Sequence, residues 1–66
     1  MQLNKEEINM NIVLEMGNWI VDDEYFITNS FYGYEVYKCG TEAEEAKELY
    51  SSESFEECLT WIWNSL

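Results

Sequence analysis

Alternation of apolar and polar residues is clearest in the middle of the chain, where it predicts a β-hairpin. The segment YEVYK (34–38) sends successive side chains to opposite faces, as a strand does. The run YFIT (25–28) is rich in aromatic and β-branched residues, which favour extended structure. Between them, NSFYG (29–33) has the composition of a turn, and Gly33 can take an unusual backbone angle. We therefore predict a hairpin over residues 25–38.

The segment 5–16 fits two patterns. Asn4 followed three residues later by Glu7 is a helix-capping signal, and Gly17 could end such a helix. However, every even position from Ile8 to Met16 is apolar, and most odd positions between them are polar, which is the pattern of a strand. The alternation favours a strand, and the helix is the alternative.

The other segments before the C-terminus predict brief elements. The segment TEAEEAKEL (41–49) starts with a capping box, Thr41 and Glu44, but has little apolar surface, so a short helix and a loop both fit. The remaining elements are a two-residue turn, a strand, an acidic turn and an edge strand, at residues 17–18, 19–21, 22–24 and 49–52.

Residues 54–65 predict an amphipathic helix that begins with a second capping box, Ser54 and Glu57. At about 100° per residue, one stripe of this helix is apolar and contains Phe55, Cys58, Leu59, Ile62 and Leu66. Trp63 falls at the margin of the stripe, so we expect it to cover the edge of the core. Trp61 falls about 120° from the centre of the stripe, so we expect it to be partly exposed.

Together these elements predict one α+β domain over residues 1–66, a small antiparallel sheet with the 54–65 helix across one face. Composition agrees with a folded chain, because 47% of the residues are hydrophobic and 17% are aromatic, too many for a disordered tail. The core must be thin, since a chain of 66 residues buries only about 60% of the surface that its unfolded form exposes.

Charge is the strongest functional signal in the sequence. The chain has 14 Asp and Glu against 3 Lys and Arg, which gives a net charge of −11. Proteins bind nucleic acids and anionic membranes through Lys and Arg, so direct binding to either is disfavoured. The charge favours a cationic partner instead. The alternative interpretation is that acidity keeps a small aromatic-rich protein in solution.

Residue types used in catalysis and in metal binding are scarce. The chain has no histidine, and its three glycines are too scattered for a phosphate-binding loop. A zinc site needs about four Cys or His ligands, and the acidic turn at 22–24 lacks the spacing of a calcium-binding loop. We therefore expect no enzymatic activity, no metal and no cofactor.

The two cysteines, Cys39 and Cys58, form no CxxC motif. We expect both to be reduced, small core residues of a cytosolic protein, with a disulfide between them as the alternative. The sequence shows neither the pattern of a secretory signal peptide nor an apolar run long enough to span a membrane.

Carboxylates are concentrated between residues 42 and 57. Their spacing on a helix would be about 6 Å for positions four apart, which is comparable to the roughly 3.4 Å between phosphates along one strand of DNA. A solvated helix face is the alternative reading. The residues predicted to bind a partner are these carboxylates, the acidic turn and one tryptophan as an aromatic anchor: Asp22, Asp23, Glu24, Glu42, Glu44, Glu45, Glu48, Glu53, Glu56, Glu57 and Trp61.

The stretch GYEVYKCG and the tail LYSSESFEECLTWIWNSL carry a resemblance to a group of known proteins. In size, acidity and aromatic content they resemble small inhibitors encoded by bacteriophages and mobile elements, such as anti-CRISPR proteins and uracil-DNA glycosylase inhibitors. The resemblance covers size, charge and the order strand–strand–helix, and assigns no functional residues. It implies a DNA-mimicking inhibitor in the cytoplasm of a bacterial host.

That reading implies a partner, a basic nucleic-acid-binding host protein, and a CRISPR effector nuclease is the first target it suggests. The alternative function is that of a small structural or accessory phage protein that acts through homo-oligomeric or other protein contacts without inhibition.

Overall fold

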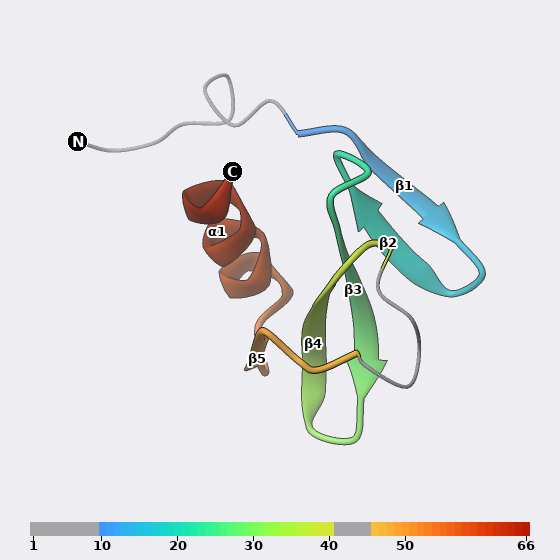
Figure 1. Cartoon of the computed structure of the whole chain (residues 1–66). Helices are drawn as coiled ribbons and strands as arrows, with labels where there is room; N and C mark the ends of the chain where they lie inside the picture. Colours follow the sequence, from blue (N-terminus) through green and yellow to red (C-terminus); the bar gives the residue numbers. More distant parts are fainter. Residues whose placement is uncertain (1–9, 41–45) are drawn as a thin grey trace.

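A five-stranded antiparallel sheet and one helix make up the part of the chain that the computed structural model describes, residues 10–40 and 46–66 (Figure 1). The sheet is a meander in which each strand pairs with its neighbour in sequence, in the order β1-β2-β3-β4-β5. The elements are β1 (Ile12–Glu15), β2 (Asn18–Val21), β3 (Tyr25–Ser30), β4 (Gly33–Lys38), β5 (Tyr50–Ser52) and α1 (Phe55–Ser65). The predicted α+β fold is confirmed.

The predicted hairpin over 25–38 is formed by β3 and β4, which are joined by the two residues Phe31 and Tyr32. The Ser30 hydroxyl accepts a hydrogen bond from the Tyr32 backbone N–H at 3.3 Å, which tightens the turn. Gly33 has a φ of +150°, and a Cβ added there would lie 2.6 Å from the Ser52 carbonyl oxygen. Glycine is therefore required at this position, where the end of β5 passes close to β4.

The first hairpin differs from its prediction by one residue. β1 and β2 are joined by Met16 and Gly17, with φ angles of 52° and 83°, so the turn lies at 16–17 and not at 17–18. Positive φ at both central residues is typical of a type I′ turn, whose twist matches that of paired strands. The predicted strand over 5–16 is confirmed for Ile12–Glu15, and its first residues, 5–9, lie outside the described residues.

The acidic turn and the edge strand are confirmed as well. Residues 22–24 join β2 to β3, and Asp22 also lengthens the first hairpin, because its backbone N–H donates to the Asn11 carbonyl at 2.8 Å while its Oδ1 accepts from the Asn11 N–H at 2.9 Å. The predicted strand at 49–52 is β5. The Thr41–Glu44 capping box lies outside the described residues, and residues 46–49 form no helix.

The core lies between one face of the sheet and α1 (Figure 1). Strand register places alternate residues on this face, so Ile27 is paired with Trp19 on one side and with Val36 on the other. The fully buried side chains from α1 are Cys58 and Ile62, which confirms the centre of the predicted apolar stripe. The buried cluster consists of Val21, Tyr25, Ile27, Val36, Cys58 and Ile62.

Aromatic rings extend the core on both sides of this cluster. On one side Trp19 meets Phe55 edge-on, with ring centroids 4.9 Å apart, and Tyr34 at 5.9 Å. On the other side Trp61 stacks on Tyr50 at 5.7 Å and meets the Tyr25 edge at 5.8 Å. A chain of this size can build a stable domain on few aliphatic residues because each ring buries a large apolar area.

Both tryptophans of α1 are half-buried, and the one whose ring packs on the buried cluster is Trp61, not Trp63 as the helical wheel predicted. Trp61 is partly exposed as expected, but its ring packs against the buried cluster. Trp63 is also half-buried, and it is not among the described side chains that pack on that cluster. The reason is that the Tyr25 and Tyr50 rings widen the apolar surface of the sheet toward the side of the helix on which Trp61 lies. Leu66, predicted in the stripe, lies beyond the helix and is 51% exposed.

The two cysteines are reduced as predicted, but only one of them is a core residue. Both thiols are free, Cys58 is buried in the core, and Cys39 is half-buried outside the buried cluster. Burial raises the pKa of both thiols, and neighbouring carboxylates, Asp23 for Cys39 and Glu57 for Cys58, raise it further. Each thiol is therefore held in its protonated, weakly nucleophilic form at neutral pH.

Replacing each tryptophan by alanine tests these placements. We expect Trp61→Ala to lower the free energy of unfolding by about 2–3 kcal/mol, because it removes a ring packed on two tyrosines, and Trp63→Ala to cost less than about 1 kcal/mol. Thermal and urea denaturation of both variants measure the difference. Equal losses for the two variants would contradict the assignment of Trp61 to the core.

Gly33 and Gly40 form a second matched pair, since both have positive φ but only Gly33 lies against other backbone atoms. We expect Gly40→Ala to cost about 1 kcal/mol from its backbone angle alone. We expect Gly33→Ala to cost about 3 kcal/mol, because the added methyl group also displaces the end of β5. Urea denaturation measures the free energy of unfolding of both variants. Similar losses would show that close contact with the end of β5 does not restrict Gly33.

Candidate functional site

The segment that leads from β5 into α1 is held by a chain of side-chain hydrogen bonds. The Ser54 hydroxyl accepts from the Glu57 backbone N–H at 3.3 Å, as the predicted capping box requires. In a complete capping box the Glu57 carboxylate would accept directly from the Ser54 backbone N–H. Here the Ser52 hydroxyl lies between them: it accepts from the Ser54 N–H at 3.0 Å and donates to Glu57 Oε1 at 2.6 Å. Glu57 is thus part of the structure of the helix start, and its carboxylate is already engaged.

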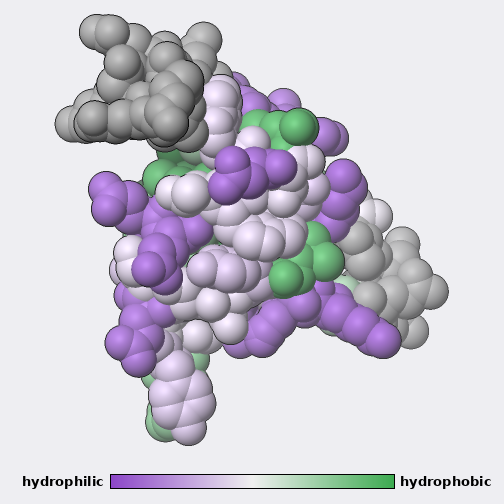
Figure 2. Space-filling view, turned by 90° about the vertical axis from the view of Figure 1, so that its left-hand side faces the viewer, coloured by the Kyte–Doolittle hydropathy of each residue, from purple (hydrophilic) through white to green (hydrophobic). Residues whose placement is uncertain are grey.

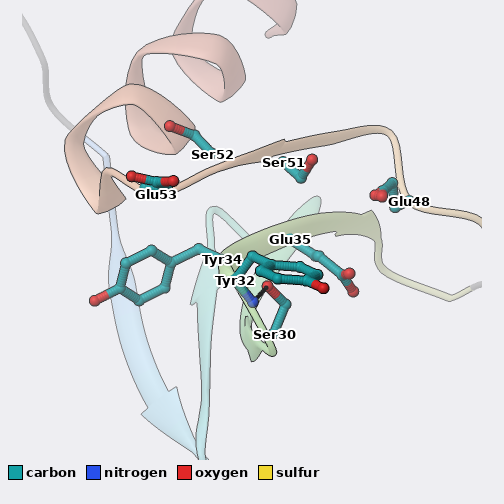
Figure 3. A pocket seen from close by; sticks show the side chains of 8 residues that line it. All are labelled: Ser30, Tyr32, Tyr34, Glu35, Glu48, Ser51, Ser52 and Glu53. Atoms are coloured by element: carbon teal, nitrogen blue, oxygen red, sulfur yellow. Dashed lines mark hydrogen bonds between the residues drawn. The ribbon is translucent and has the colours of Figure 1, made fainter.

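A shallow depression of about 210 Å³ lies next to this segment, between the end of the β3–β4 hairpin and residues 48–53 (Figure 3). Figure 3 shows the side chains that line it in two groups, one from residues before α1 and one from the hairpin: Glu48, Ser51, Ser52 and Glu53 on one side, and Ser30, Tyr32, Tyr34 and Glu35 on the other. The lining contains three carboxylates, three hydroxyls and two phenol rings, from Ser30, Tyr32, Tyr34, Glu35, Glu48, Ser51, Ser52 and Glu53.

The carboxylates of the depression leave most of their acceptor capacity unused by the described residues. Glu35 accepts one hydrogen bond, from the Tyr37 hydroxyl at 2.7 Å. This bond, together with desolvation and the charges of Glu35 and Glu48, raises the pKa of Tyr37 above 10.0, so the phenol stays a neutral donor. Glu48 and Glu53 are exposed. The depression therefore offers negative charge and aromatic rings to an incoming cationic group.

Two large aromatic side chains project at the rim of the depression. Phe31 is 91% exposed and Tyr32 is 80% exposed, and their rings meet edge-on with centroids 4.9 Å apart. We call this pair the aromatic tip. Seen from the side of the helix, the end of the β3–β4 hairpin is a narrow projection at the bottom of the molecule, pale and green rather than purple (Figure 2). The rings contact each other and leave most of their surface to solvent.

The sequence analysis placed Phe31 and Tyr32 in a turn and did not include them among the predicted partner-binding residues. A signal was present, because tight turns favour Gly, Pro, Asn, Asp and Ser, and a Phe-Tyr pair at the two central positions is unusual there. Tyr32 joins the aromatic tip to the depression, since it lines that depression as well.

Those predicted partner-binding residues that the structure describes lie in separate places. Glu48 and Glu53 line the depression, and Glu56 and Glu57 follow in the first turn of α1. The acidic turn lies between β2 and β3, at the opposite end of β3 from the aromatic tip. Glu42, Glu44 and Glu45 lie outside the described residues. Trp61 is partly exposed and packs on the Tyr25 and Tyr50 rings, and its role as an aromatic anchor stays a prediction.

Positive charge does little to balance these carboxylates in the described part of the chain. Lys38 lies over the Tyr25 ring, with its Nζ 4.9 Å from the ring centroid, and Lys47 is exposed. Within residues 10–40 and 46–66, no group of three or more His, Cys, Asp and Glu side chains is arranged to hold a metal ion. In the same residues, no helix has the length and apolarity needed to cross a membrane.

Comparison with protein families, with curated proteins and with solved structures finds no match to this chain.

The serine between β5 and α1 allows a test of this part of the structure. We expect Ser52→Ala to lower the free energy of unfolding by about 1–2 kcal/mol, because it leaves the Ser54 N–H and the Glu57 carboxylate without their shared partner. Its neighbour Ser51 is exposed, and we expect Ser51→Ala to change stability by less than about 0.5 kcal/mol. Denaturation curves measure both, and indistinguishable curves would contradict a structural role for the Ser52 hydroxyl.

Proposed function

We propose that this protein is an inhibitor that binds the basic nucleic-acid-binding site of a host protein and blocks it by imitating the charge of DNA. The observation that carries the proposal is the net charge of −11 combined with a carboxylate-lined depression beside an exposed aromatic pair. A groove that binds phosphates through Lys and Arg can bind carboxylates through the same groups.

Charge supplies the rate of encounter. A chain with so large an excess of negative charge is attracted to a basic groove from a distance, and such steering raises association rates. The same charge destabilises the chain through self-repulsion, and the core among the described residues is small, with six buried side chains to oppose it. Solubility alone would be served by mixed surface charges, whereas this chain has 3 basic residues in total.

The aromatic tip supplies the anchor. Phe31 and Tyr32 stand next to the depression, so a partner that covers its carboxylates also meets these rings. Aromatic side chains dominate binding hot spots because they desolvate a large area and lose little conformational freedom. This arrangement adds to the anchor role predicted for Trp61.

The target follows from the resemblance to small phage-encoded inhibitors. A CRISPR effector nuclease in the cytoplasm of a bacterial host is the first target proposed, because it holds nucleic acid in a long positively charged channel. The inhibitor would occupy part of that channel and exclude the target DNA by direct competition.

Binding kinetics with a purified, guide-loaded CRISPR effector nuclease test the proposal. We expect the wild-type chain to compete with target DNA and to bind more weakly as salt rises. The double variant Glu48→Lys, Glu53→Lys should associate about tenfold more slowly at low salt, because charges at the rim act mainly on association. The double variant Phe31→Ser, Tyr32→Ser should dissociate about 30-fold faster, a loss of about 2 kcal/mol.

A charge-matched control is available at the other end of β3. Asp23 and Glu24 are exposed in the acidic turn, and reversing both to Lys changes the net charge by the same amount as reversing Glu48 and Glu53. We expect this control to slow association much less, because the acidic turn lies far along the sheet from the depression. Failure of a large excess of the wild-type chain to displace DNA from the nuclease, and from a uracil-DNA glycosylase assayed in parallel, would refute the proposed function.

A further inference from the structure

The described sheet has two edge strands, and β1 is the longer and more apolar of them, since β5 has three residues, Tyr50–Ser52. Among the described strands β1 pairs only with β2, and all four of its side chains are exposed. Residues in an antiparallel pair alternate between hydrogen-bonded and non-hydrogen-bonded positions. Since Asn11 is bonded to Asp22, the next bonded positions are Val13 and Glu15, and the N–H and C=O groups of Ile12 and Leu14 point away from the sheet.

This open edge is apolar on both faces. Ile12 and Leu14, on the face that bears the helix, are 41% and 65% exposed, and Val13, on the opposite face, is 45% exposed. Natural proteins protect edge strands with lysine, proline, a bulge or a covering element. β1 contains no lysine or proline, and its register with β2 is continuous. A strand of this kind attracts another strand.

The distribution of charge determines which strand can approach the open edge of β1. Residues 10–21 contain a single charged side chain, that of Glu15, although the chain as a whole has a net charge of −11. The two paired strands of the first hairpin are thus nearly neutral, and the nearest carboxylate beyond them, that of Asp22, bonds to Asn11 from the β2 side, away from the open edge of β1. Two copies of this chain repel each other elsewhere, and at this edge they can come together with little repulsion.

We propose that β1 pairs with β1 of a second copy of this chain, so that two five-stranded sheets join into one continuous sheet across a two-fold axis. The outward groups of Ile12 then bond to those of Leu14 of the partner subunit, and the reverse pair is identical by symmetry. Val13 meets Val13 of the partner subunit on the axis. Glu15 lies opposite Asn11 of the partner subunit, so the single carboxylate of β1 meets an amide and not a second carboxylate.

The interface is small, because a four-residue strand buries less surface than a permanent dimer needs. The dimer should therefore dissociate on dilution, with a dissociation constant on the order of 10–100 µM. The proposal does not depend on the inhibitory function, since the aromatic tip and the depression lie on the β3–β4 side of the sheet and stay accessible in such a dimer.

Sedimentation equilibrium of the full chain is the first test. We expect the mass to rise from 7.9 kDa toward twice that value as the concentration increases through this range. Val13→Glu places two carboxylates opposite each other on the axis and should raise the dissociation constant at least about tenfold. Ser51→Glu adds the same charge to the exposed face of the other edge strand, β5, and should leave the dissociation constant within about twofold.

Cross-linking tests the register independently of affinity. In a background with Cys39→Ser, Val13→Cys places two thiols at a non-hydrogen-bonded pair, where Cα atoms are about 4.5 Å apart, within the range of a disulfide. We expect this variant to form a covalent dimer under mild oxidation much faster than Tyr32→Cys in the same background, although Tyr32 is more exposed.

Circular dichroism of each variant checks that its fold is kept, which we expect because the substituted positions Val13, Tyr32 and Ser51 are exposed. A wild-type chain that stays monomeric up to millimolar concentration would overturn the proposal, and so would a strand partner supplied only by a different protein. Equal weakening by Val13→Glu and Ser51→Glu, or equal cross-linking at the two cysteine positions, would also overturn it.

Discussion

The burial of Ile62 and Cys58 against Ile27 and Val36 is the contact on which the rest of this structure depends. These side chains are completely buried, and they join the single described helix to the centre of the sheet. Without the helix, the sheet would expose its apolar face to water, and the largest buried apolar contact of the described domain would be lost. The chain has few other large aliphatic residues in its core, so aromatic rings complete the packing on both flanks.

The large negative charge has to be kept away from this small core, and this constraint determines where the carboxylates lie. The carboxylates are kept out of the helix–sheet interface, and in the described residues no buried side-chain polar atom is left without a hydrogen-bond partner. Some acidic groups are used locally, as Asp22 is in the first hairpin and Glu57 is at the start of α1. Others, such as Glu48 and Glu53, remain free at the depression. The distinction separates carboxylates that maintain the fold from those available to a partner.

Local patterns in the sequence were sufficient to predict the hairpin and the helix. Alternation determined residues 25–38, and a cap with an apolar stripe determined 54–65. The position of Trp61 could not be predicted this way, because it depends on the Tyr50 ring, which comes from a three-residue strand whose pairing no local pattern specifies.

The candidate site was predictable in its charge but not in its composition. The excess of carboxylates over 42–57 is visible in the sequence, yet the separation of Glu48 and Glu53 from the acidic turn follows from the direction in which β3 runs. The aromatic tip was missed because turn analysis considers backbone angles and not where the side chains project. Likewise, the role of Ser52 at the helix start lies outside the capping-box pattern, which begins two residues later.

The meander order of the strands determines which part of the described sheet can open locally. β1 is attached to the rest of the sheet through β2 alone, and none of its side chains is buried, so it can separate from the sheet without disturbing the helix–sheet interface. Its amides should therefore exchange with solvent through local opening, while those of β3 and β4 exchange only when the whole domain unfolds. The described domain thus consists of a cooperative centre, which includes β2, and a first strand, β1, that opens separately.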